Sequence, residues 1–179
     1  MAHDVLQQAK ADGLQVIVAD HHQTGGGLPP CYALINPRRP DDTSQLGHLA
    51  AVGVTFMLVV AVNHALRQRG FFDTRDEPQL TQLLDLVSLG TVCDVVPLKG
   101  LNRAFVVKGL QVMSQQQNIG LRALMRVGRL DGPPKPYHLG FVLGPRINAG
   151  GRIGDAALGS RLMTTDDDIL AEEIAQQLE

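Results

Sequence analysis

The feature that most constrains this chain is a short apolar segment that ends in polar residues. Residues 15–20 read QVIVAD, a β-branched run typical of a buried strand, and a helical pattern over 3–12 with a stop at Gly13 precedes it. A helix, a glycine and a buried strand form the second half of a βαβ unit, which predicts an α/β fold with a parallel sheet. We expect the first strand of that unit to lie outside this sequence.

Asp20, His21 and His22 follow this strand directly. In an open α/β sheet, ligands bind beyond the carboxyl ends of the strands, and carboxylate and imidazole groups suit a divalent metal ion. Because neighbouring side chains on an extended segment point in opposite directions, we expect one imidazole to bind a metal and the other to face the substrate or support the site. A polar strand end that is exposed and binds nothing is the alternative.

Composition narrows the class of protein. With 44% hydrophobic residues and a net charge of −2, the chain is typical of a soluble globular protein without a global basic surface for nucleic acid. Aromatic residues make up only 4%, so base stacking is not expected to dominate any nucleic-acid contact. Two cysteines without CxxC spacing and no secretory signal indicate reduced thiols in the cytoplasm. The longest apolar run, 49–62, is too short to cross a bilayer, so no membrane is expected.

The rest of the chain reads mainly as helices. A second short strand is expected at 33–36 and a proline-rich connector at 130–137. Thr165 is the expected N-cap of the last helix. The predicted helices cover 48–70, 77–91, 102–117, 121–127, 156–163 and 166–179.

Asp94 lies among apolar residues at the end of a predicted helix, just before Pro97. Aspartate is rarely buried unless it is paired or binds a metal, which makes Asp94 a candidate ligand that would have to fold next to His21. The alternative is a carboxylate that caps a turn before Pro97.

A glycine-rich segment, 144–152 (GPRINAGGR), is predicted to be a loop that binds an anion. Glycines let a backbone approach a phosphate, and Arg146 and Arg152 supply forked donors on either side of Asn148. The alternative is a structural turn in which one arginine forms a salt bridge. The P-loop pattern GxxxxGK[ST] does not occur, so a nucleotide P-loop is excluded.

Several segments together resemble one known family. VIVADHH, LINP, AAVGVTF, LVSLGTVCDVVPL and GPRINAGGRIGDA occur in this order, and they are similar to the DHH phosphoesterase superfamily and, within it, to the RecJ-type exonucleases. The resemblance implies the C-terminal part of a DHH-type parallel-sheet domain followed by a helical segment, with the N-terminal strands and the C-terminal domains absent. It implies a partial catalytic domain at 1–145, then a phosphate-binding loop and the start of a helical connector at 146–179.

The same resemblance implies a site with two divalent ions, Mn²⁺ or Mg²⁺. His21 and Asp94 would bind metal, His22 would lie toward the scissile phosphate, and Asp20 would orient the site. The phosphates of DNA would be bound by Arg146, Asn148 and Arg152.

The implied activity is two-metal hydrolysis of single-stranded DNA from its 5′ end, in DNA repair and recombination, with single-strand-binding protein and a helicase as expected partners. The family's first two acidic motifs do not occur here, so we expect this chain alone to be inactive. The alternatives are another DHH phosphodiesterase, acting on short RNA oligonucleotides or cyclic dinucleotides, or a non-catalytic module that binds phosphate or nucleic acid.

Overall fold

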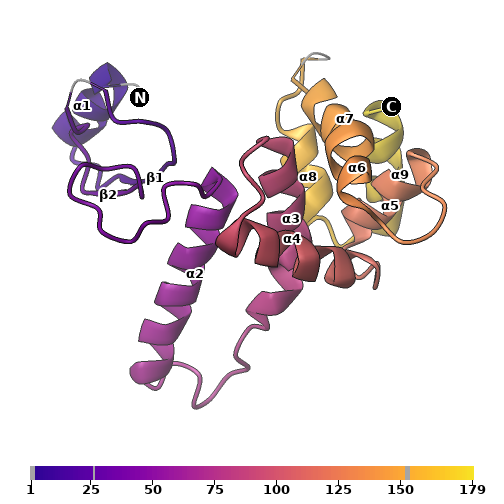
Figure 1. Cartoon of the computed structure of the whole chain (residues 1–179), viewed down its shortest axis with the longest axis horizontal. Helices are drawn as coiled ribbons and strands as arrows, with labels where there is room; N and C mark the ends of the chain where they lie inside the picture. Colours follow the sequence, from indigo (N-terminus) through magenta and orange to yellow (C-terminus); the bar gives the residue numbers. More distant parts are fainter. Residues whose placement is uncertain (1–2, 26, 152–153) are drawn as a thin grey trace. The chain divides into compact units, whose positions relative to one another are not determined.

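The chain divides into two compact units, Met1–Arg75 and Asp76–Glu179. The structure, a computed structural model, describes residues 3–25, 27–151 and 154–179. The colours of Figure 1 run from indigo at the start of the first unit to yellow at the end of the second.

The first unit contains the predicted parallel strands. β1 and β2 pair in parallel, with Ile17 opposite Ala33 and Ala19 opposite Ile35. Both strands are shorter than the sequence predicts, because each pairs with only one neighbour over three residues. The unit's elements are α1 (His3–Ala11), β1 (Ile17–Ala19), β2 (Ala33–Ile35) and α2 (Ala51–Gln68).

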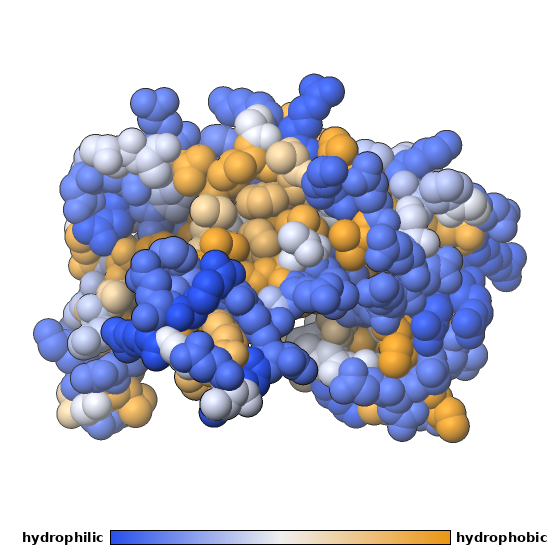
Figure 2. Space-filling view, turned by 90° about the horizontal axis from the view of Figure 1, so that it is seen from below, coloured by the Kyte–Doolittle hydropathy of each residue, from blue (hydrophilic) through white to orange (hydrophobic). Residues whose placement is uncertain are grey.

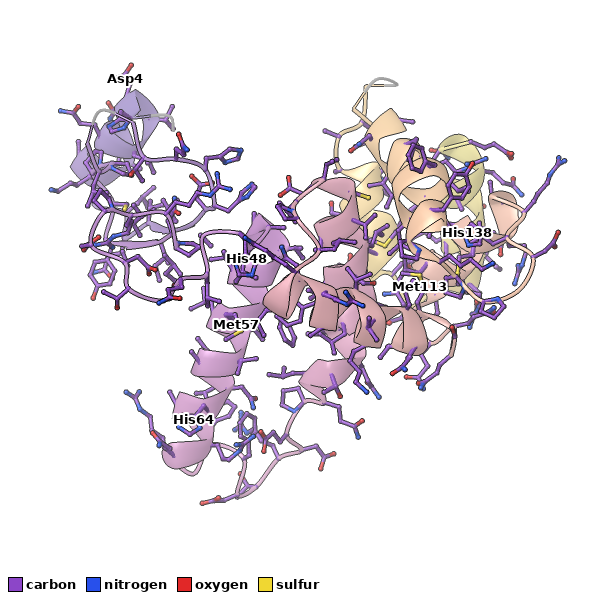
Figure 3. The ribbon with its side chains drawn as sticks, in the orientation of Figure 1. Asp4, His48, Met57, His64, Met113 and His138 are labelled. Atoms are coloured by element: carbon purple, nitrogen blue, oxygen red, sulfur yellow. The ribbon has the colours of Figure 1, made fainter. Side chains whose placement is uncertain are left out.

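The helix α2 is apolar but largely uncovered. Along it, only Gly53, Val54 and Asn63 are buried among the described residues, and Figure 3 shows Met57 and His64 along its length. By length and composition alone α2 could cross a membrane, although a core helix of a soluble protein passes the same test. With 18 residues, α2 is longer than the apolar run 49–62 that was predicted to be too short to cross a bilayer. Figure 2 shows hydrophobic side chains reaching the surface of the molecule among hydrophilic ones.

The second unit is helical. Figure 1 shows α3 beside α4, and α5 beside α9. Its core is a cluster of leucine, methionine, alanine and isoleucine side chains from all the longer helices, including the fully buried Leu124 and Leu143. The elements are η1 (Leu80–Leu83), α3 (Leu84–Cys93), α4 (Gly100–Met113), α5 (Ile119–Val127), α6 (Pro136–His138), η2 (Leu139–Leu143), α7 (Gly144–Ala149), α8 (Leu158–Thr164) and α9 (Asp168–Gln177).

Glycines let these helices approach one another closely. A Cβ atom at Gly109 of α4 would lie 2.1 Å from the carbonyl oxygen of Leu84 and 2.4 Å from the Cβ of Ser88, both in α3. A Cβ at Gly120 of α5 would lie 1.9 Å from the carbonyl oxygen of Leu162 in α8. The backbones therefore touch where any larger residue would hold them apart.

Two sequence predictions about this unit are wrong in detail. Asp167, not Thr165, caps α9, because its carboxylate accepts from the backbone N–H of Ile169 and Leu170; the Thr165 hydroxyl instead accepts from the N–H of Asp167 at 3.1 Å. The predicted loop at 144–152 is helical as far as Ala149. The boundary predicted between residues 145 and 146 falls inside α7, and the division into a catalytic and a phosphate-binding part stays a prediction.

Candidate metal and nucleic-acid site

Asp20 follows β1 and turns the chain. Its backbone N–H still bonds to the carbonyl of Ile35, at 3.0 Å, which keeps it at the carboxyl end of the strand pair. Its side-chain oxygen Oδ1 then accepts from the backbone N–H of His21 at 2.8 Å and of His22 at 3.2 Å. An aspartate that bonds the following backbone amides fixes a local turn, so the two histidines leave the strand direction.

The two imidazole rings lie together as a result. Their centroids are 4.4 Å apart with an interplanar angle of 56°, so the prediction that the histidines point in opposite directions is wrong. The prediction assumed an extended backbone, whereas the turn at Asp20 replaces it. The side chains differ in exposure, because His21 is buried and the side chain of His22 is 78% exposed.

Asp20 also holds the ring of His22. Oδ1 of Asp20 lies 2.7 Å from Nδ1 of His22. Partial burial raises the pKa of Asp20, but the hydrogen bonds from His22 and His21 outweigh it and leave that pKa below its usual value. An ionised carboxylate can only accept, so Nδ1 of His22 is the donor in this hydrogen bond. A carboxylate that fixes a histidine tautomer in this way is typical of metal-binding and catalytic histidines.

Asn36 is a site residue that the sequence analysis did not single out. It follows β2, is 3% exposed, and its side-chain amide donates to the carbonyl oxygen of His22 at 2.9 Å. Its own oxygen accepts from the N–H of Arg38 at 2.8 Å. The rule that located Asp20 also finds it, because Asn36 is the first residue after the neighbouring parallel strand and the carboxyl ends of such strands meet at one edge.

Asp94 is the C-cap of α3, as the sequence analysis placed it, but it is exposed rather than buried. The burial was inferred from its apolar neighbours, of which Val95 is itself exposed. Val95 has φ of +55°, a left-handed conformation that costs a β-branched residue roughly 1–2 kcal/mol and that glycine usually occupies after a helix. Strain of this kind gathers at functional sites, which keeps Asp94 a candidate.

The predicted anion loop has a different form. Arg146 lies in α7, where its Nη1 donates to the carbonyl of Val142 at 2.9 Å and its Nη2 lies 3.7 Å from the carboxylate of Glu179. This salt bridge matches the alternative considered for the segment. Asn148 is exposed on the same short helix, and Arg152 lies outside the described residues. The prediction of a loop was wrong because it rested on the three glycines and one proline of this segment, two of which α7 accommodates in its first turn.

A glycine contact joins this segment to the end of α3. A Cβ at Gly144 would lie 2.5 Å from Sγ of Cys93, the residue before Asp94. Burial, with a smaller effect of Asp94, raises the pKa of the Cys93 thiol, so this cysteine is a packing residue rather than a nucleophile. A pocket of about 340 Å³ beside this contact is lined by Cys93, Gly144, Asn148 and Ser160 together with mainly apolar residues. Within the second unit, the end of α3, which carries Asp94, therefore lies next to α7, which carries Arg146.

Within residues 3–25, 27–151 and 154–179, no group of three or more His, Cys, Asp or Glu side chains is arranged to hold a metal ion. His21 and Asp94 belong to different compact units. Their sharing of one ion therefore stays a prediction, as do the roles of His22, Asp20 and the three phosphate-binding candidates.

Comparison with known proteins gives consistent matches. The sequence profile of the DHH family, N-terminal domain, matches residues 1–91. The single-stranded-DNA-specific exonuclease RecJ of Dickeya dadantii is 41% identical over 182 residues, covering 99% of this chain and 32% of the relative. RecJ of Escherichia coli is 40% identical with the same coverage. The chain thus spans about a third of the length of these relatives.

Solved structures of RecJ also match this chain. A crystal structure of exonuclease RecJ bound to manganese superposes with a TM-score of 0.81 at 33% identity, covering 98% of this chain and 42% of that one. RecJ from Thermus thermophilus in complex with Mn²⁺ gives a TM-score of 0.80 at 34% identity, covering 98% and 25%. These findings confirm the predicted α/β fold class and the resemblance to RecJ.

Proposed function

Because this chain belongs to the DHH family, we propose that it forms the central part of a RecJ-like exonuclease that hydrolyses single-stranded DNA from its 5′ end. One observation carries the proposal. The Asp20–His22 segment is held at the carboxyl end of a parallel strand pair, in a chain that aligns along 99% of its length with single-stranded-DNA-specific exonucleases.

The cofactor in this proposal is a pair of Mn²⁺ or Mg²⁺ ions, the metals in the solved RecJ complexes. Imidazole nitrogen and carboxylate oxygen suit these ions, and His21 and Asp94 are the proposed ligands. The tautomer that Asp20 imposes on His22 fits such a site. A bound metal pair activates water and stabilises the leaving oxygen.

The chain's own residues would act on the phosphate. Asp20 holds the ring of His22 through Nδ1, and His22 in this position would offset the charge that develops on the scissile phosphate. Arg146 binds a DNA phosphate with Asn148 and Arg152, after exchanging its weak 3.7 Å contact with Glu179 for the phosphate.

The remaining parts of the site lie outside these 179 residues in this proposal, since the chain spans about a third of its relatives. Further metal carboxylates and the walls that exclude duplex DNA would come from there. The proposed setting is DNA repair and recombination in the cytoplasm, with single-strand-binding protein and a helicase as partners and without a membrane. The relatives align with the chain across α2. This supports the proposal that the apolar helix is part of the enzyme's core.

A chimera tests the proposal. The matching segment of Escherichia coli RecJ is replaced by this chain, and nucleotide release is followed from 5′-labelled single-stranded and duplex DNA, with Mn²⁺ or with EDTA. We expect metal-dependent release from the single strand. Asp94→Ala should lower the rate by at least about 100-fold, since even an outer-shell partner of a metal contributes about 10–100-fold.

Asp131→Ala, which removes another exposed carboxylate of the second unit, is the matched control and should leave the rate unchanged. Arg146→Ala should weaken DNA binding and reduce the slope of log K against log salt by about one. Full activity in the Asp94→Ala chimera would remove Asp94 from the metal site. Activity on short RNA or cyclic dinucleotides in place of DNA would favour another DHH phosphodiesterase.

A further inference from the structure

Two exposed aromatic rings form a stacked pair on the second unit. Tyr137 of α6 and Phe141 of η2 have ring centroids 5.1 Å apart and an interplanar angle of 23°. Tyr137 is 63% exposed and Phe141 is 72% exposed. A chain with only 4% aromatic residues thus leaves two of them in solvent, one against the other.

The backbone holds this pair in place. Leu139 and Leu143, on either side of Phe141, are fully buried in the core of the unit, so the turn that carries the phenylalanine is anchored at both ends. This turn is a π-helix, a conformation that is rare and frequent at functional sites. The ring of His138 packs edge-on against Tyr137 at 6.0 Å, and its Nδ1 accepts from the N–H of Lys135 at 3.2 Å. The rings are therefore ordered before any ligand arrives, which lowers the entropic cost of binding.

Two basic residues come before and after the rings along the same continuous helical stretch. Lys135 is exposed at the start of α6. Arg146 comes five residues after Phe141, and its Nη1 donates to the carbonyl of Val142, the residue next to Phe141. Exposed aromatic faces with cations beside them are the two components of single-strand binding sites, where bases stack and phosphates pair with lysine and arginine. An ordinary apolar protein contact would not need the cations.

We propose that the Tyr137–Phe141 pair is a stacking platform for one unpaired base of single-stranded DNA, with Lys135 and Arg146 placed for the adjacent phosphates. The inference deepens the proposed function and rests on it for the class of ligand. Recognition through a π face would be tolerant of sequence, as a nuclease that degrades any strand requires. A duplex, whose bases are stacked on one another, would offer no face to the rings.

The test measures binding of the chain to labelled single strands by fluorescence anisotropy in EDTA. One oligonucleotide carries thymine bases, and the second has the same sugar-phosphate backbone without bases. We expect Phe141→Ala and Tyr137→Ala each to weaken binding of the base-bearing strand by about five-fold or more, and to leave the abasic strand unaffected. Phe141→Trp should restore binding.

Ile169→Ala is the matched control, because Ile169 of α9 is an aliphatic side chain of the same exposure, 72%, and offers no π face to a base. It should change neither measurement. Equal losses on both strands, no loss on either, or no binding by the unaltered chain would overturn the platform. A Phe141→Ala variant that instead shifts the sedimentation coefficient of the chain would assign the pair to contact with a second copy, which also overturns it.

The chimera assay separates this inference from the proposed function. A chimera that cleaves DNA equally well with Phe141 or alanine, and binds base-bearing strands equally, keeps the nuclease and removes the platform. Base-dependent binding by the chain beside an inactive chimera keeps the platform and removes the nuclease assignment.

Discussion

The two compact units are stabilised in different ways. Among the described residues, three buried apolar side chains belong to the first unit and eighteen to the second. The chemistry-bearing turn of the first unit is held by hydrogen bonds from Asp20 and Asn36. The second unit is held by helix packing around Leu124 and Leu143. Packing resists deletion of single polar contacts, whereas a turn held by hydrogen bonds depends on each of them.

The units also shift the pKa of an aspartate in opposite directions. In the first unit, hydrogen bonds from His22 and His21 outweigh burial and lower the pKa of Asp20. In the second unit, burial dominates and raises the pKa of Asp85, although its carboxyl accepts from the backbone N–H of Leu86. The first environment favours the charged form of a carboxyl, as a functional site requires.

The largest expected effect tests the packing difference. Gly109→Ala places a Cβ against backbone atoms of α3, and overpacking of this kind costs about 1–3 kcal/mol. Thermal or urea unfolding should show this loss in the second unit. The control is Gly25→Ala in the first unit, where a Cβ meets nothing within 4 Å, and it should be neutral or slightly stabilising. Equal losses at both positions would show that the two units are packed alike.

A pair of asparagines tests the dependence on hydrogen bonds. Asn36→Ala removes the donor to His22 and the acceptor of Arg38, which we expect to cost about 1–3 kcal/mol of local stability. Hydrogen exchange of the amides of His21 and His22 should accelerate while exchange in α5 stays unchanged.

Asn118 provides the counterpart in the second unit, because it also bonds two backbone groups, the N–H of Leu121 and the carbonyl of Met163. Asn118→Ala should cost about 1 kcal/mol, spread over the unit's global unfolding. If Asn36→Ala left the exchange of His21 and His22 unaltered, the turn would not depend on Asn36.

The smallest expected effect concerns pH. Because the pKa of Asp85 is raised in the folded state, ionisation of its carboxyl destabilises the fold, and stability falls as the pH rises above the ordinary value of 3.8. Asp85→Asn should therefore be more stable than the unaltered chain at pH 7, with the difference closing toward pH 4. Urea unfolding at several pH values measures this.

Asp20→Asn, measured in metal-free buffer, should change the stability in the opposite direction. The lowered pKa of Asp20 contributes stability that is present above its ordinary pKa and is lost as the pH falls through the folded value. This variant should be less stable than the unaltered chain at pH 7. A common sign for the two variants would contradict the difference between the two environments.

The sequence by itself determined the elements with a strong local period and the positions of the polar strand ends. The parallel pair, the helices α2 to α5, and the positions of Asp20 after β1 and Asp94 after α3 follow from hydrophobic periodicity and from breakers such as Gly13 and Pro97. These features depend on neighbours within a few residues, which a sequence displays directly.

Only the tertiary structure decided how the side chains at those positions meet. The turn that brings His21 against His22 depends on the rotamer of Asp20, and its support by Asn36 joins residues fourteen positions apart. The approach of Gly144 to Cys93 joins residues still more distant. Such contacts depend on how separate elements pack and on which backbone groups are left unpaired, and no local pattern of residue types encodes either.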